Sequence, residues 1–303
     1  MNRVSTDSLR TLADFIRWAA SRFQAAGLHY GHGTDNALDE AAALVLGSLH
    51  LPHDLDPIYF GSALTADERE LLFERIEERV VQRRPVPYIL GEAWFCGLAF
   101  GVDEQVLIPR SPIAELIESG FEPWVDPDRL ERIADVGTGS GCIAIAAALA
   151  LPEVEVEALD NAPAALTRTA DNAARYGVEA RVHVQASDLL DAIAPEPVLD
   201  LIVSNPPYVE AAAMAALPPE YRHEPRAALA AGDDGLDAVR RLLPQAAQRL
   251  TDHGLLIAEI GHGAAAFEAA FPDLPITWLE FERGGHGVFA VDAGTLRSAF
   301  AAR

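Results

Sequence analysis

Asp135-Val136-Gly137-Thr138-Gly139-Ser140-Gly141 joins a short apolar run, residues 132–136, to an alanine-rich segment, residues 141–150. The run has the length and composition of a buried strand, and alanine favours a helix. Glycine has no Cβ, so three glycines let the backbone turn sharply and approach a ligand closely. A helix that begins here also points its free N–H groups at that ligand. The stretch therefore predicts a strand, a tight loop and a helix start that together bind a small molecule.

The alternation of strand and helix continues along the rest of the chain. Strand-like runs lie at residues 132–136, 154–159, 181–185, 199–204 and 254–260, and most are separated by helical segments such as 162–176. This order predicts an α/β fold with a parallel sheet that is covered on both faces. Residues 287–291 predict a late strand, which we expect to be antiparallel.

The first part of the chain has a different pattern, because residues 5–85 read as helices. Thr65 and Glu68 have the spacing of a capping box, and an earlier segment repeats apolar residues on one helical face: Leu9, Leu12, Ile16, Ala19 and Phe23. Trp94-Phe95 and Phe100-Gly101-Val102 predict a short hairpin. We therefore divide the chain into a helical domain, residues 1–87, a hairpin linker, residues 88–112, and an α/β domain, residues 113–303.

Composition excludes several classes of protein. The 303 residues carry a formal charge of -23, which repels phosphate backbones and attracts basic partners, so we expect no direct binding of nucleic acid. Cys96 and Cys142 are the only cysteines, and the histidines are scattered, so no disulfide framework and no metal site is indicated. The sequence has no signal-peptide pattern and no apolar stretch long enough to span a bilayer, which predicts a soluble cytoplasmic protein without a membrane partner.

Carboxylates follow three successive predicted strands, at Asp135, Asp160 and Asp188. Ligands of open α/β sheets bind at the carboxyl ends of the strands, and Asp160 is placed to accept the hydroxyls of a ribose. Asp135 would repel a pyrophosphate but suits the ammonium of a methionine moiety, so the pattern favours S-adenosylmethionine over a dinucleotide. Asp188 could accept the adenine amino group, and Leu189 could cover the ring. Each aspartate could instead serve only as a turn or cap residue.

Ser204-Asn205-Pro206-Pro207-Tyr208 ends the strand-like run 199–204. Asn205 offers an amide oxygen, the prolines have no N–H of their own, and Tyr208 adds a flat apolar face, which together suit a planar amide or amine. Taken alone, the stretch could be an ordinary turn at the end of a strand. The candidate catalytic residues are Asn205, Pro206, Pro207 and Tyr208; the candidate cofactor-binding residues are Asp135, Gly137, Thr138, Gly139, Ser140, Gly141, Asp160, Asp188, Leu189 and Asn205.

These two motifs carry a resemblance to a known family. Asp-x-Gly-x-Gly-x-Gly followed by Asn-Pro-Pro-Tyr resembles the Rossmann-like class I methyltransferases, which use S-adenosylmethionine and modify amide or exocyclic amino nitrogens. Further stretches are similar to the protein-glutamine methyltransferases over roughly residues 70 to 292. They are Tyr88-Ile89-Leu90-Gly91, Phe95-Cys96-Gly97-Leu98, Val106-Leu107-Ile108-Pro109-Arg110 and Glu224-Pro225-Arg226-Ala227-Ala228-Leu229. Glu224-Pro225 could line the substrate cleft or be part of a structural loop.

Pro109-Arg110-Ser111-Pro112 differs from the Pro-Arg-Pro that release-factor-modifying members usually carry. It resembles the branch that methylates a glutamine of large-subunit ribosomal protein L-three, a basic partner that fits an acidic surface. The resemblance implies that the two amide N–H groups of glutamine donate to the Asn205 oxygen and the Pro206 carbonyl, while Tyr208 stacks on the amide. It also implies a helical N-terminal domain, which we expect to help hold the partner. No histidine is needed as a base.

Three other functions remain open on the sequence. Release factors are the substrates of the sister branch of the same family. Adenine also presents a planar amino group to such a clamp, although a methyltransferase of nucleic acid would need phosphate contacts. A binding module that kept the fold but lost the reaction is a third possibility, and such proteins typically lose one of the two motifs that are complete here.

Overall fold

The computed structural model describes residues 8–300, which form two compact units. One unit comprises the described residues up to Ala93 together with Pro218–His223, and the other comprises Trp94–Leu217 and the described residues from Glu224 onward. The segment 218–223 groups with the helical unit, whereas the division made from the sequence leaves it in the α/β domain. None of the helices within 8–300 is long and apolar enough to cross a membrane.

The helical unit packs amphipathic helices around a core of its own. Its elements are α1 (Leu12–Ala25), α2 (Ala37–Ser48), η2 (Pro57–Gly61), α3 (Ala66–Glu77), η3 (Glu78–Gln82), α4 (Val86–Leu90) and η5 (Pro219–His223). The predicted apolar face of α1 is buried, and the predicted capping box at Thr65 begins α3, because Thr65 Oγ1 accepts from the Glu68 N–H while Glu68 accepts from the Thr65 N–H. Both predictions are confirmed.

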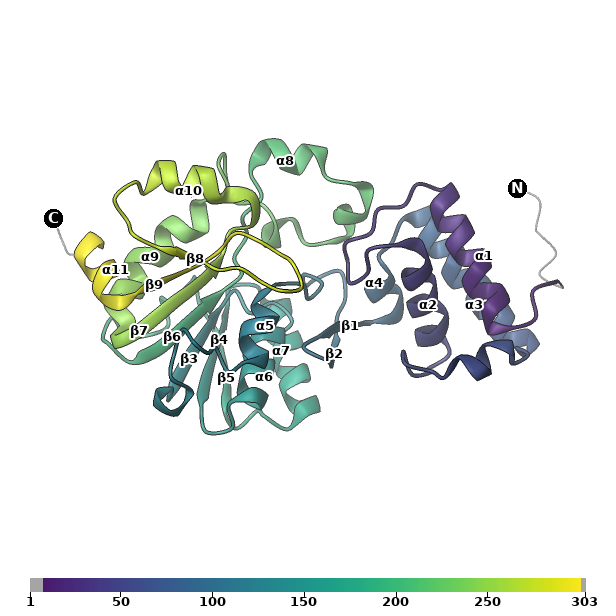
Figure 1. Cartoon of the computed structure of the whole chain (residues 1–303), viewed down its shortest axis with the longest axis horizontal. Helices are drawn as coiled ribbons and strands as arrows, with labels where there is room; N and C mark the ends of the chain where they lie inside the picture. Colours follow the sequence, from purple (N-terminus) through teal and green to yellow (C-terminus); the bar gives the residue numbers. More distant parts are fainter. Residues whose placement is uncertain (1–7, 301–303) are drawn as a thin grey trace. The chain divides into compact units, whose positions relative to one another are not determined.

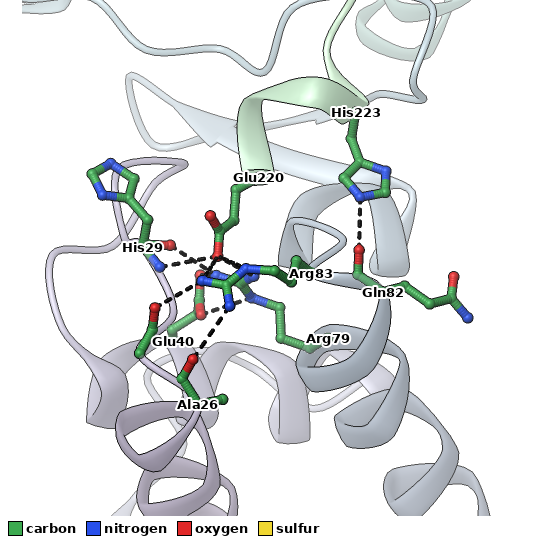
Figure 2. A network of polar contacts seen from close by, with 9 residues as sticks. Ala26, His29, Glu40, Arg79, Gln82, Arg83, Glu220 and His223 are labelled. Atoms are coloured by element: carbon green, nitrogen blue, oxygen red, sulfur yellow. Dashed lines mark hydrogen bonds and ion pairs between the residues drawn. The ribbon is translucent and has the colours of Figure 1, made fainter. Parts of the chain in front are cut away.

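A network of buried ions ties Pro218–His223 to the helical unit (Figure 2). The fully buried Arg79 of η3 donates from Nε to Glu40 at 3.0 Å, and its Nη1 lies 3.6 Å from Glu220 Oε1. Glu220 also accepts from Arg83 Nε at 3.1 Å and from the backbone N–H of His29 at 3.0 Å. Buried charges are tolerated only when they are paired and hydrogen-bonded, so this network specifies where the segment lies.

The second unit is built on a seven-stranded sheet in the order β5-β4-β3-β6-β7-β9-β8. The strands are β3 (Arg132–Val136), β4 (Glu155–Asp160), β5 (Val182–Ala186), β6 (Leu199–Ser204), β7 (Leu250–Glu259), β8 (Thr277–Trp278) and β9 (Val288–Asp292). β3 to β7 are parallel, while β9 runs antiparallel to β7, as predicted. β1 (Glu92–Phe95) and β2 (Leu98–Gly101) form the predicted hairpin. The α/β class is therefore confirmed.

Helices cover both faces of the sheet (Figure 1). Alternate strand residues face opposite sides, so that Ile133 packs with α5 (Ile113–Glu118), α6 (Cys142–Ala150) and α7 (Pro163–Tyr176), whereas Ala134 packs on the other side. That second face is covered by α9 (Asp237–Arg249), α10 (Ala264–Ala270) and α11 (Ala293–Phe300). Shorter helices are η4 (Pro127–Arg129), α8 (Ala211–Ala216), η6 (Arg226–Ala228) and η7 (Gly261–Gly263).

Candidate active site

The strand order reverses between β3 and β6. The chain runs outward from β3 through β4 to β5 and then returns to the opposite side of β3 as β6. Val136, near the carboxyl end of β3, pairs with Leu159 of β4 on one side and with Ser204 of β6 on the other. Open α/β sheets bind ligands at such a reversal of strand order, because the loops on either side diverge there. The glycine loop follows β3 and Asn205 follows β6, so the two motifs flank this point.

The glycine loop is held against β4 by its backbone. The N–H groups of Gly137 and Thr138 donate to the Leu159 carbonyl at 2.8 and 2.9 Å. Gly137, Gly139 and Gly141 have φ angles of 78°, 59° and 81°, where other residues are strained. Gly141 caps α6, and a Cβ there would lie 2.8 Å from Thr169 Cγ2. The predicted loop between strand and helix is therefore present.

Asp135 lies at the base of this loop with 1% of its surface exposed. One carboxylate oxygen, Oδ2, accepts from Thr138 Oγ1 at 2.7 Å and from the Ala144 N–H at 3.1 Å, while no hydrogen-bond partner for Oδ1 lies among residues 8–300. Burial raises the pKa of Asp135 to about 7, although those two hydrogen bonds oppose the shift. A buried carboxylate oxygen without a donor fits an incoming ammonium group, as the methionine part of S-adenosylmethionine provides.

Asp160 ends β4 and is half-buried. Its Oδ2 accepts from the Gly139 N–H and its Oδ1 from the Ala162 N–H, both at 2.9 Å. The second of these is the Asx turn that the sequence left open as an alternative. A carboxylate oxygen has a further lone pair, so the same side chain orients the glycine loop and can still accept a ribose hydroxyl.

Asp188 and Leu189 follow β5. Asp188 is exposed and accepts from Arg241 Nη2 of α9 at 2.6 Å, a partner that the sequence did not indicate. Leu189 is half-buried and has a left-handed backbone, with φ at 54°. Both residues lie at the predicted strand end, beyond Asp160 in the order of the sheet.

Asn205 and Tyr208 are each held by a hydrogen bond from a segment far away in the sequence. Asn205 Nδ2 donates to the Arg110 carbonyl at 3.3 Å, and the Tyr208 hydroxyl donates to Glu259 Oε1 at 2.9 Å. The glycines around Tyr208 leave room for it, because a Cβ on Gly261 would lie 2.6 Å from its ring and one on Gly235 would lie 2.4 Å from its carbonyl oxygen. Pro206 is buried and Pro207 half-buried between them.

Glu259 is a site residue that the sequence analysis missed. It ends β7 and is 5% exposed, with Ser111 Oγ donating to its second oxygen at 2.5 Å. Burial raises the pKa of Glu259, whereas the hydrogen bonds from Ser111 and Tyr208 and the charge of Arg110 oppose that shift. A signal was present, because Glu259 is a carboxylate at the end of a predicted buried strand, as Asp135 and Asp160 are.

Glu224, whose role the sequence left open, is held by Arg110. Arg110 donates to both of its carboxylate oxygens, from Nη1 at 2.5 Å and from Nη2 at 2.7 Å. The Glu224 side chain is fully buried, so the Arg110 pair anchors its segment within the α/β unit.

His262 and His286 are exposed and contact each other, with Nδ1 and Nε2 3.2 Å apart. Among residues 8–300 there is no group of three or more metal-ligating side chains.

The parallel sheet, the glycine loop at the strand reversal and the Asn-Pro-Pro-Tyr loop beside it define a Rossmann-like class I methyltransferase that uses S-adenosylmethionine. The family model of the methyltransferase small domain matches residues 123–218. Among solved structures, the human methyltransferase 10 domain containing protein has a TM-score of 0.45 and 19% identity, covering 64% of this chain and 87% of that one.

Curated relatives narrow the class to one family. The chain is 50% identical over 282 residues to the ribosomal protein uL3 glutamine methyltransferase of Bordetella pertussis, covering 92% of this chain and 94% of that one. It is 47% identical over 296 residues to the enzyme of that name from Xanthomonas campestris, covering 98% and 96%. The corresponding enzyme of Francisella tularensis is 41% identical over 283 residues, covering 93% and 90%. The chain belongs to the family of ribosomal protein uL3 glutamine methyltransferases.

Proposed function

We propose that this protein transfers a methyl group from S-adenosylmethionine to the side-chain amide nitrogen of a glutamine in ribosomal protein uL3, which is large-subunit protein L-three. The observation that carries the proposal is the place of Asn205 directly after β6, on the opposite side of β3 from β4 and Asp160, in a chain 50% identical to an enzyme named for this reaction. Bound S-adenosylmethionine supplies an electrophilic methyl group on a sulfonium.

The proposed contacts of Asn205 and Pro206 address the low reactivity of the glutamine amide. The amide lone pair of glutamine is delocalised into its carbonyl, so the nitrogen is a weak nucleophile. In our proposal the two N–H groups donate to Asn205 Oδ1 and to the Pro206 carbonyl, which orients the nitrogen and favours its rehybridisation. Tyr208, held by Glu259, stacks against the amide plane. The nitrogen loses its proton after transfer, so no tuned base is required.

The cofactor-binding residues are assigned in the same way. We propose that Asp135 Oδ1 faces the ammonium, that Asp160 accepts from the ribose, and that Asp188 and Leu189 contact the adenine. The backbone of the loop Gly137-Thr138-Gly139-Ser140-Gly141 surrounds the donor. The support is the unpaired buried oxygen of Asp135 and the place of each residue at one edge of the sheet.

Asn205→Ala tests the acceptor assignment. We expect it to reduce incorporation of labelled methyl into purified uL3 by about a hundredfold or more, because the oriented acceptor for the amide is lost. The affinity for S-adenosylmethionine, measured by calorimetry, serves as the control. Asn205 is one of ten candidate contacts with the donor, so this affinity is expected to stay within about threefold. Full activity in this variant would refute the assignment.

A comparison of substrates tests the choice of uL3. Purified uL3, a peptide chain release factor, and duplex DNA or RNA are each incubated with enzyme and labelled S-adenosylmethionine. We expect label in uL3 alone, at a glutamine located by mass spectrometry, because the formal charge of -23 disfavours nucleic acid. Faster labelling of the release factor would move the protein to the sister branch.

We also propose that the reaction takes place in the cytoplasm, where ribosomal proteins are made.

We propose in addition that the helical unit helps hold a basic segment of uL3. Ile58 and Tyr59 of η2 are 78% and 56% exposed, beside Asp54 and Asp56. We expect the double variant Ile58→Ser, Tyr59→Ser to raise the KM for uL3 about tenfold with an unchanged affinity for S-adenosylmethionine. An unchanged KM would remove this surface from substrate recognition.

A further inference from the structure

The side chain of Asn205 can work as an acceptor in only one of its two amide orientations. If the NH₂ end faced the substrate, it would meet the N–H groups of glutamine donor to donor. Asn205 contacts the Arg110 carbonyl, with Nδ2 at 3.3 Å. Because a carbonyl can only accept, the NH₂ end must face Arg110, and the oxygen is turned to the opposite side of the amide. The position of this carbonyl therefore decides which end of Asn205 is presented.

The Arg110 carbonyl belongs to a segment that is fixed by one buried carboxylate. Arg110 binds Glu224 through two parallel hydrogen bonds, at 2.5 and 2.7 Å, and its Nη1 also lies 3.3 Å from the Ile108 carbonyl. Glu224 Oε1 accepts in addition from the Ile108 N–H at 3.3 Å. Bidentate pairs of arginine and carboxylate are among the strongest and most directional side-chain contacts in proteins. Residues 108–110 are thus held to Glu224 by both backbone and side chain.

The next residue is held as well. Ser111 Oγ donates to Glu259, the same carboxylate that accepts from the Tyr208 hydroxyl. Residues 108–111 therefore contact Asn205 directly, through the Arg110 carbonyl, and are linked to Tyr208 through Glu259. A shift of this segment would move the amide orientation and the aromatic face together.

We propose that Arg110 and Glu224 are positioning residues of methyl transfer, which hold the Arg110 carbonyl so that Asn205 presents its oxygen to the substrate amide. This inference rests on the proposed role of Asn205. Arg110 acts through its own backbone and not by touching the substrate, and Glu224 acts through Arg110. The pair is required for the rate of transfer and not for binding of the methyl donor.

Glu224→Gln and Arg110→Lys test the proposal, since each keeps the size of the side chain but loses the bidentate ion pair. We expect kcat with uL3 to fall about 10- to 100-fold, because a displacement of the order of 1 Å costs that much in rate. The KM for uL3 and the affinity for S-adenosylmethionine are expected to change by less than about threefold. Arg110→Met should be slower than Arg110→Lys, which keeps the charge and can donate one hydrogen bond.

The matched control is Glu118→Gln. Glu118 also accepts twice from an arginine, Arg283, at 2.5 and 3.3 Å, but its side chain is 43% exposed and Arg283 is not the residue whose carbonyl holds Asn205. This variant should keep its kcat. Melting temperatures of all variants report whether a loss of rate reflects unfolding, and Arg110→Lys keeps the test informative if Glu224→Gln fails to fold.

The outcomes separate this inference from the proposed function. If Asn205→Ala is inactive while the Arg110 and Glu224 variants keep a wild-type kcat, the positioning role is wrong and the acceptor assignment stands. If Asn205→Ala is active, the acceptor assignment itself fails. A fall in kcat that merely follows the loss of folded protein or of donor affinity would also overturn the positioning role.

Discussion

The carboxylates of Asp135 and Glu259 are both buried within the α/β unit, but their surroundings differ. Both oxygens of Glu259 accept hydrogen bonds, from Ser111 and from Tyr208. Asp135 uses one oxygen only, and the other lacks a partner among the described residues. Internal donors therefore reach both oxygens of Glu259, whereas Asp135 Oδ1 is left for the ammonium contact that we propose.

This difference predicts a proton linked to cofactor binding. Burial raises the pKa of Asp135 to about 7, so the carboxyl of the cofactor-free protein is largely protonated at pH 6. An ammonium beside Oδ1 lowers that pKa, so binding of S-adenosylmethionine at pH 6 to 7 should release a proton, and its affinity should increase as the pH rises through this range. Calorimetry in two buffers of different ionisation enthalpy measures the release. Equal heats in the two buffers would contradict an ionic contact with Asp135.

The same pKa shift affects the stability of the cofactor-free protein. The folded-state pKa of Asp135 lies above the ordinary value of 3.8, so its contribution to stability is full below that pH and is lost as the pH rises to about 7. Asp135→Asn should therefore flatten the decline in melting temperature between these pH values and abolish the proton release on binding.

At the scale of elements, the end of β7 and the start of β9 approach so closely that only glycine fits. A Cβ on Gly287, whose φ is 73°, would lie 1.8 Å from the Gly261 carbonyl oxygen. Ile260 N also donates to the Gly287 carbonyl at 2.7 Å, next to Glu259. This contact keeps the antiparallel β9 in place behind the residues that hold Tyr208.

Gly287→Ala should destabilise the protein by about 3 kcal/mol or more, since the added carbon meets backbone that cannot move aside. Gly284→Ala is the matched control, because its φ of 85° is equally unfavourable but nothing lies within 4 Å of the new carbon. The control should cost about 1 kcal/mol, the strain of the left-handed backbone alone. Urea denaturation measures both, and equal losses would refute the close approach.

Most elements were predictable from the sequence, because helix and strand periods are local properties. Residues 199–204 were predicted as a strand with the observed bounds, and the capping box at Thr65 was found from its spacing. β7 begins at Leu250, earlier than predicted. The prediction placed its start too late because the exposed residues Asp252 and His253 interrupt the apolar pattern. The short β8, residues 277–278, was missed, since two residues carry no period.

At the scale of the whole molecule, the segment 218–223 belongs to the helical unit although it follows the Asn205 loop in the chain. Its last residue, His223, directly precedes Glu224, so Glu220 and Glu224 anchor neighbouring stretches of chain within different units. Glu220 contacts Arg79 and Arg83, whereas Glu224 contacts Arg110.

Glu220→Gln should destabilise the protein by about 3 kcal/mol, because it removes a carboxylate from a fully buried arginine, Arg79. Asp234→Asn is the comparison, since Asp234 and Arg240 form an exposed pair whose loss should cost less than about 1 kcal/mol. Thermal and urea unfolding check both values. Similar small losses for the two variants would show that the buried network does not determine where the segment lies.

The acidic charge of the whole chain predicts a salt-dependent reaction. A formal charge of -23 should accelerate the encounter that we propose with a basic ribosomal protein, and added salt should screen that attraction. We expect kcat/KM for uL3 to fall about tenfold between 50 and 500 mM NaCl, with a much smaller change in the affinity for S-adenosylmethionine. A flat dependence on salt would exclude electrostatic steering.

The sequence alone determined the order of most strands and helices along the chain, the glycine loop and the Asn-Pro-Pro-Tyr motif, because residues close together in the chain encode these features. It did not indicate the contacts that hold the motif. Arg110 and Glu224 are 114 residues apart, and Ser111 and Glu259 are 148 apart. Only the tertiary structure decided these pairs, since the period of a strand tells which face a side chain lies on but not what the fold brings against it.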